Sequence, residues 1–136
     1  MTDNGTTSII LVEDDPALTR LMTHCLERAG FRVESIGDGR EALDLPQRDT
    51  LADLVIVDYL MPYANGLKVT RALRADPRWQ AVPIICVTEI SSEDTMIDGL
   101  RLRSDGFMTK PIDPGELVGL ARRLMRATPV PDGMAD

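Results

Sequence analysis

Three consecutive carboxylates, Glu13, Asp14 and Asp15, directly follow a short apolar run near the start of the chain. Two like charges about 4 Å apart repel by about 4 kcal/mol near a protein surface, so this cluster calls for a compensating cation. Carboxylate oxygens are the ligands that Mg²⁺ prefers, usually one or two of them together with phosphate oxygens and water. The cluster therefore indicates a site for a divalent cation.

Three other polar residues, Asp58, Thr88 and Lys110, each stand at the end of a short apolar run. An aspartate can act as a nucleophile that forms an acyl phosphate. A lysine supplies a mobile positive charge for a phosphate oxygen, and a threonine hydroxyl can donate to another oxygen once phosphate is present. Together with the acidic cluster, this set suits phosphoryl transfer to a carboxylate.

Short apolar runs alternate with longer segments of helical period along the whole chain. The first, third and fourth runs are apolar throughout, as expected of parallel strands that are covered on both faces. The alternation predicts an α/β fold, a five-stranded parallel sheet with helices on both faces in a doubly wound (βα)5 arrangement. Chemistry in such sheets gathers beyond the carboxyl ends of the strands, where the residues above would meet. We expect strands over residues 9–12, 31–36, 54–57, 84–87 and 106–109.

The segments between the predicted strands carry helix start and stop signals. Asp15 is placed to cap the first helix, and Gly30 to end it. Pro46 should end the second helix early, and Asp113 should cap the last one. We expect helices over residues 16–29, 66–75 and 92–102, a second helix that is capped by Asp38 and ends early at Pro46, and a last helix that begins at Pro114.

The composition predicts an acidic, soluble single domain. The net charge of −7 and the pI near 4.7 argue against direct binding of nucleic acid or of an anionic membrane. The apolar runs are too short to span a bilayer, and no signal peptide is visible. Cys25 and Cys86 stand in apolar patterns, which indicates buried thiols and a cytoplasmic location. We expect the domain over residues 8–126, with flexible ends over 1–7 and 127–136.

Four segments together resemble the receiver domain of bacterial two-component response regulators: "ILVEDDP", "VIVDYLMPYANG", "PIICVT" and "DGFMTKP". The resemblance covers about residues 8–126 and implies a flavodoxin-like fold. It implies a phosphorylation-dependent signalling switch, and not an enzyme, because such a domain catalyses only its own phosphotransfer and dephosphorylation. The phosphoryl donor would be a sensor histidine kinase or a histidine phosphotransfer protein, with Mg²⁺ or Mn²⁺ as the cofactor.

The resemblance also implies roles for individual residues around the predicted metal site. Asp58 matches the phosphoacceptor. Glu13 and Asp14 match the acidic pair that holds the metal with Asp58, with Asp14 as a direct ligand and Glu13 acting largely through water. The backbone carbonyl of Leu60 would complete the protein's ligands. Asp15 follows the pair and is expected to cap the helix, without binding metal.

The remaining matched residues belong to the phosphate contact and the switch. Lys110 matches the lysine that contacts the phosphoryl group, and its bond to Pro111 is expected to be cis. Thr88 matches the switch hydroxyl and Phe107 the switch aromatic. The switch would change the face made by the helix over 92–102, the strand over 106–109 and the last helix. A second copy of the chain or a separate output partner would read that face.

Three kinds of alternative compete with this interpretation of the sequence. A receiver-like interaction module would keep the fold without being phosphorylated, and Glu89 supports this because it adds negative charge beside the path of an anionic donor. A phosphatase of the haloacid dehalogenase type or a nuclease of the topoisomerase-primase type would need a second aspartate two residues after Asp58, where Leu60 stands. A flavin binder would need a Ser/Thr/Gly-rich loop after the first strand, where acidic residues stand.

Overall fold

The computed structural model describes residues 7–59, 66–88 and 104–127, and these contain the five predicted strands. The strands form one parallel sheet in the order β2-β1-β3-β4-β5. Each strand begins and ends within one residue of its predicted bounds. They are β1 (Ser8–Val12), β2 (Arg32–Ile36), β3 (Leu54–Asp58), β4 (Ile84–Thr88) and β5 (Gly106–Thr109).

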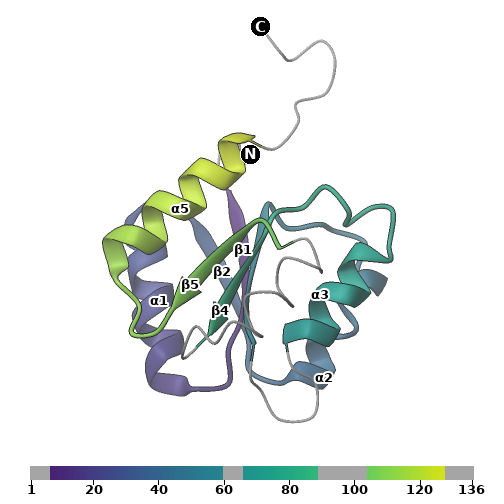
Figure 1. The fold of residues 1–136 in the computed structure, drawn as a ribbon, viewed down its shortest axis with the longest axis horizontal. Coiled ribbons are helices and arrows are strands. Elements are labelled where there is room, and N and C mark those ends of the chain that lie inside the picture. Colours follow the sequence, from purple (N-terminus) through teal and green to yellow (C-terminus); the bar gives the residue numbers. More distant parts are fainter. Residues whose placement is uncertain (1–6, 60–65, 89–103, 128–136) are drawn as a thin grey trace, which may run out of the picture.

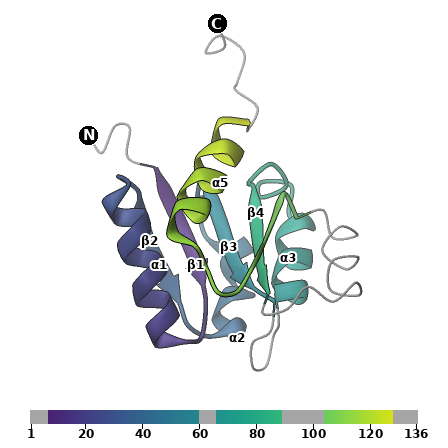
Figure 2. The ribbon, with the colours of Figure 1, turned by 60° about the vertical axis from the view of Figure 1, so that its left-hand side comes forward.

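Helices cover both faces of this sheet, which confirms the doubly wound arrangement (Figures 1 and 2). Helices α1 (Pro16–Arg28) and α5 (Pro114–Ala127) lie on one face, and α2 (Gly39–Ala42) and α3 (Gly66–Arg74) on the other. The helix predicted over 92–102 lies outside the described residues. Within the described ranges, no helix has both the length and the apolar character that crossing a membrane requires.

The core is divided by the sheet into two apolar layers. Successive residues of a strand point to opposite faces, so strands that are apolar throughout supply both layers. Strands β3 and β4 are buried at every position. Met22, Leu26 and Leu117 pack from α1 and α5 on one face, and Val69, Leu73 and the fully buried Trp79 pack on the other.

The second helix is as short as Pro46 predicts. Helix α2 ends at Ala42 and is followed by a 3-10 helix, η1 (Leu45–Gln47), that contains the proline. The Arg78 guanidinium, from the loop after α3, donates to the carbonyl of Pro46 and, at 2.8 Å, to that of Arg48. Arg48 in turn donates to both carboxylate oxygens of Glu34 in β2 and holds the pKa of that carboxyl below its usual range. These hydrogen bonds hold the segment that follows α2 against β2, an edge strand of the sheet.

Ordered structure reaches slightly further than the predicted domain at both ends. The carbonyl of Thr7 accepts a hydrogen bond of 2.8 Å from the backbone N–H of Arg32, and α5 continues to Ala127. The remainder of the two predicted flexible ends, 1–6 and 128–136, lies outside the described residues.

Gly66 marks a close approach between the start of α3 and the end of β3. A Cβ at this position would lie 2.5 Å from the carbonyl oxygen of Asp58 and 2.9 Å from the Cα of Tyr59. Both are backbone atoms, so neither can rotate away. We therefore expect Gly66→Ala to lower the free energy of unfolding by about 3 kcal/mol, measured by urea denaturation.

Gly119 in α5 offers a matched control, because a Cβ there meets no atom within 4 Å. Alanine is the better helix former, so Gly119→Ala should raise the stability by about 0.5–1 kcal/mol. Equal effects of the two substitutions would contradict the close approach at Gly66.

Candidate functional site

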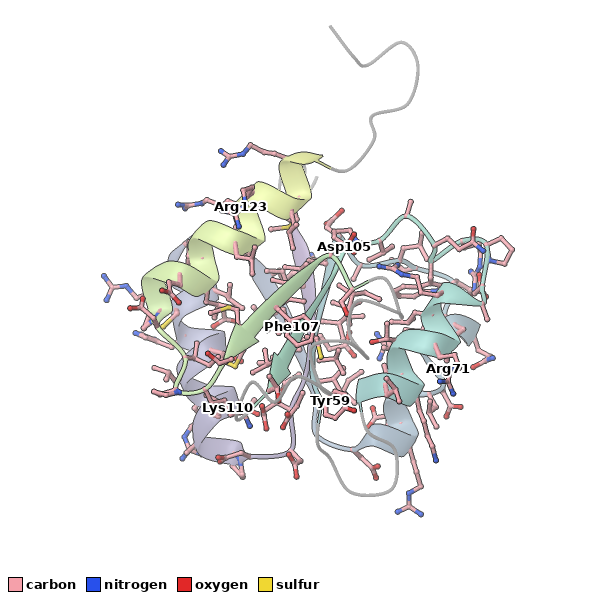
Figure 3. All side chains as sticks on the ribbon, viewed as in Figure 1. Tyr59, Arg71, Asp105, Phe107, Lys110 and Arg123 are labelled. Carbon is pink, nitrogen blue, oxygen red and sulfur yellow. The ribbon has the colours of Figure 1, made fainter. Side chains whose placement is uncertain are left out.

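The carboxyl ends of four strands bring the predicted site residues together. Asp58 and Thr88 are the last residues of β3 and β4, Glu13 directly follows β1, and Lys110 directly follows β5. Figure 3 shows Lys110 at this end of the sheet and Asp105, which precedes β5, at the opposite end. The arrangement is the one predicted from the strand ends.

Glu13, Asp14 and Asp58 form an acidic cluster. Each offers a carboxylate oxygen, and these oxygens lie within 4.8 Å of one another. Glu13 and Asp58 are only 3% and 4% exposed, whereas Asp14 is open to solvent. Asp15 instead caps α1, as predicted, because its Oδ1 accepts from the backbone N–H of Ala17 at 2.9 Å.

Lys110 supplies a positive charge to this cluster. Its Nζ lies 3.2 Å from Asp58 Oδ2 and 3.7 Å from Glu13 Oε1, and its side chain is 21% exposed. The Lys110–Pro111 peptide bond is cis, as the resemblance implies. One partly buried ammonium thus faces two buried carboxylates, and a third carboxylate lies beside them.

The electrostatics of Glu13 show that this charge is not fully balanced. The pKa of Glu13 is raised to about 7, mainly by burial and in smaller part by Asp58, against the opposing effects of the Asp15 backbone N–H and the charge of Lys110. Oxygen ligands in close array with an excess of negative charge are what a divalent cation requires. The described residues therefore fit a metal such as Mg²⁺ or Mn²⁺.

The two predicted switch residues lie on neighbouring strands. Thr88 is 3% exposed at the carboxyl end of β4. Phe107 is half-buried on β5, paired in register with Cys86, and lies further from the carboxyl end of its strand (Figure 3). Thr88 therefore lies at the same end of the sheet as Asp58, and Phe107 lies two residues before the end of β5.

Both cysteines are free thiols, as predicted, but only Cys86 is buried, since Cys25 is half-buried. Burial raises the pKa of the Cys86 thiol to about 12, with a smaller contribution from the charge of Asp58. The Cys86 thiol therefore stays protonated near neutral pH, which makes it a poor nucleophile.

The structure adds contacts to Glu13 that the motif alone did not reveal. The backbone N–H of Asp15 donates to Glu13 Oε2 at 3.1 Å, and the Thr19 hydroxyl donates to the Glu13 carbonyl at 3.3 Å. Thr19 lies one turn into the helix that Asp15 caps, and this position could have indicated its hydrogen bond to the Glu13 carbonyl from the sequence. Two residues singled out in the sequence lie outside the described residues: the predicted ligand Leu60, and Glu89, which follows Thr88 in the sequence.

Comparison with known proteins agrees with this geometry. The family described as response regulator receiver domain matches residues 9–122. The DNA-binding response regulator MtrA of Mycolicibacterium smegmatis is 38% identical over 118 residues, which make up 87% of this chain and 50% of that protein. The chain thus spans about half the length of the curated relatives it matches.

Solved structures share the fold over nearly the whole chain. The signal receiver domain of a signal transduction histidine kinase from Syntrophus aciditrophicus has a TM-score of 0.84 and 30% identity, covering 96% of this chain and 98% of that one. The receiver domain of a sensor histidine kinase from Pseudomonas aeruginosa PAO1, with a magnesium ion coordinated in its active site cleft, has a TM-score of 0.83 and 27% identity, covering 90% and 100%. With the family matched from residue 9 to residue 122 and its fold reproduced, this chain belongs to the receiver domain family of two-component response regulators.

Proposed function

We propose that this receiver domain accepts a phosphoryl group on Asp58 from the phosphohistidine of a sensor histidine kinase or of a histidine phosphotransfer protein. The observation that carries the proposal is the buried Asp58 carboxylate, 3.2 Å from the Lys110 ammonium and inside an acidic cluster. A carboxylate oxygen of Asp58 attacks phosphorus while the N–P bond breaks. The electron pair of that bond returns to the imidazole, which takes a proton from solvent, and Lys110 contacts a phosphoryl oxygen.

The proposal includes a divalent cation, Mg²⁺ or Mn²⁺, held by Asp14 and Asp58 directly and by Glu13 largely through water. The backbone carbonyl of Leu60 is proposed as the remaining protein ligand. When bound, the ion would offset the charge of the acidic cluster and of the incoming phosphoryl group. Support comes from the oxygens that lie within 4.8 Å of one another and from the magnesium ion in the Pseudomonas aeruginosa receiver domain.

The proposed output is a change of surface shape. The Thr88 hydroxyl would donate to a phosphoryl oxygen, and Phe107 would rotate inward behind it, which biases the population of two conformations. The face expected to change comprises β5 and α5, together with the helix predicted over 92–102. A second copy of the chain or an output partner would bind this face.

The same proposal makes the domain a switch that catalyses only its own phosphotransfer and dephosphorylation. It does not include nucleic acid or a membrane as a direct ligand, because the net charge of −7 would oppose both phosphate backbones and anionic lipids. A cytoplasmic location is part of the proposal, since the free thiols of Cys25 and Cys86 suit a reducing compartment.

Metal dependence tests this proposal. Incubation with acetyl phosphate and Mg²⁺ should add one phosphoryl group to the chain, measured by intact mass, and a chelator should prevent the addition. Asp14→Asn should shift the required Mg²⁺ concentration upward by about 10-fold or more, because a ligand is lost. Addition that proceeds equally well with the chelator would contradict the proposed site. Mg²⁺ binding without any addition would favour an interaction module that is not phosphorylated.

A further inference from the structure

The two carboxylate oxygens of Glu13 have different partners. Oε2 accepts a hydrogen bond of 3.1 Å from the backbone N–H of Asp15, at the start of α1. Oε1 lies on the other side, 3.7 Å from the Lys110 ammonium. The side chain is almost fully buried, at 3% exposure, so water cannot easily replace either contact. The hydrogen bond to Oε2 thus leaves Oε1 as the oxygen beside Lys110.

The side chain of Asp15 holds this N–H in place. Its Oδ1 accepts from the backbone N–H of Ala17 at 2.9 Å and of Leu18 at 3.5 Å, while its carbonyl accepts from the N–H of Thr19 at 2.9 Å. The residue has extended backbone angles, φ −84° and ψ 115°, which the cap maintains at the helix start. Asp15 therefore caps the start of α1 through its side chain and contacts Glu13 through its backbone N–H.

We propose that Asp15 is a positioning residue of the cation site. Its side-chain cap keeps its own backbone N–H on Glu13 Oε2, and so keeps Oε1 turned toward Lys110. Asp15 acts here as a hydrogen-bond acceptor, not through its charge. The inference deepens the proposed function and rests on it, because it concerns the same metal site.

Substitutions at Asp15 separate the cap from the charge. Asp15→Asn and Asp15→Ala both remove the charge, but only the alanine variant loses the acceptor, since Asn caps a helix as well as Asp does. We expect Asp15→Ala to weaken Mg²⁺ binding about 10-fold by titration calorimetry, as for other residues that orient metal ligands. Asp15→Asn should bind Mg²⁺ clearly more tightly than Asp15→Ala. With acetyl phosphate, Asp15→Ala should be slow at limiting Mg²⁺ and recover at saturating Mg²⁺.

Asp113 provides the control for loss of a cap in general. It caps α5 through Oδ1, which accepts from the backbone N–H of Glu116 at 3.1 Å. Asp113→Ala should lower the melting temperature much as Asp15→Ala does, yet leave Mg²⁺ affinity unchanged.

Three results would overturn the inference about Asp15. These are Mg²⁺ affinity that is unchanged in Asp15→Ala, affinity that is equally weak in Asp15→Asn and Asp15→Ala, or affinity that is also weakened in Asp113→Ala. Wild-type protein that binds no Mg²⁺ at all would overturn the proposed function itself, and this outcome is distinct from the other three.

Discussion

Lys110→Met should destabilise the metal-free protein and, in the presence of Mg²⁺, slow phosphorylation of Asp58. The ammonium lies 3.2 Å from Asp58 and 3.7 Å from Glu13, and both carboxylates are almost fully buried. Removing the cation leaves these two like charges facing one another. Because Lys110 is partly exposed, we expect a loss of about 2 kcal/mol in the free energy of unfolding, somewhat less than for a fully buried pair.

The effect of Lys110→Met on phosphoryl transfer should be larger. A fixed positive group aimed at the reacting oxygens stabilises developing charge, and losing such a group costs on the order of 100-fold in rate. Added Mg²⁺ should raise the melting temperature of the variant more than that of the wild type, because no ammonium then competes for the carboxylates. Weaker stability, a larger response to Mg²⁺ and slow phosphorylation are therefore expected together.

Two further lysine variants control this experiment. Lys110→Arg keeps the positive charge and should retain most of the stability of the metal-free protein. Lys68→Met replaces an exposed lysine of α3 and should leave stability and phosphorylation rate near their wild-type values. A Lys110→Met protein as stable and as readily phosphorylated as Lys68→Met would contradict the role given to Lys110.

Arg74→Met should destabilise the fold by about 2 kcal/mol without touching the proposed phosphorylation site. The Arg74 side chain, 10% exposed, donates to the carbonyl oxygens of Gln80 and Val82 at 3.2 and 2.9 Å, and to Asp105 Oδ2 at 2.7 Å. The same Asp105 oxygen accepts from the backbone N–H of Ile84 at 2.8 Å. One guanidinium thus joins the end of α3 to the starts of β4 and β5, and its loss removes the donor of all three contacts, of which the one to Val82 is part-buried.

Arg71 is the matched control for Arg74, because it lies on the same helix but is exposed (Figure 3). Arg71→Met should change the free energy of unfolding by less than about 0.5 kcal/mol. A double-mutant cycle of Arg74→Met with Asp105→Asn should give a coupling of at least about 1 kcal/mol. Additive effects would show that the two side chains contribute independently, contrary to the geometry.

The fold could be predicted from the sequence because local and long-range signals agree. Continuous apolar runs can be buried only in a sheet that is covered on both sides, and the caps of the intervening segments fix where the helices begin. Pro46 even predicted the short α2, since a proline cannot continue a helix. The predicted strand ends then placed Asp58 and Thr88 at the carboxyl end of the sheet.

The side-chain contacts that hold these elements together could not be predicted from local sequence patterns. Arg74 and Asp105 meet only because α3 and β5 are brought together by the tertiary fold, and neither residue stands in a local pattern. The high pKa of Glu13 likewise depends on burial, which the acidic motif does not specify. Cys25 was predicted to be buried but is half-buried, because an apolar stripe on a helix does not specify how much of each side chain is exposed.

The role of Asp58 as phosphoacceptor is tested by comparing the intact mass of the wild type with that of Asp58→Ala. Both proteins are incubated with Mg²⁺ and acetyl phosphate under the same conditions. We expect one added phosphoryl group on the wild type and none on Asp58→Ala, whose folding is verified by its thermal unfolding. Equal addition to both proteins would contradict the assignment of Asp58 as the phosphoacceptor.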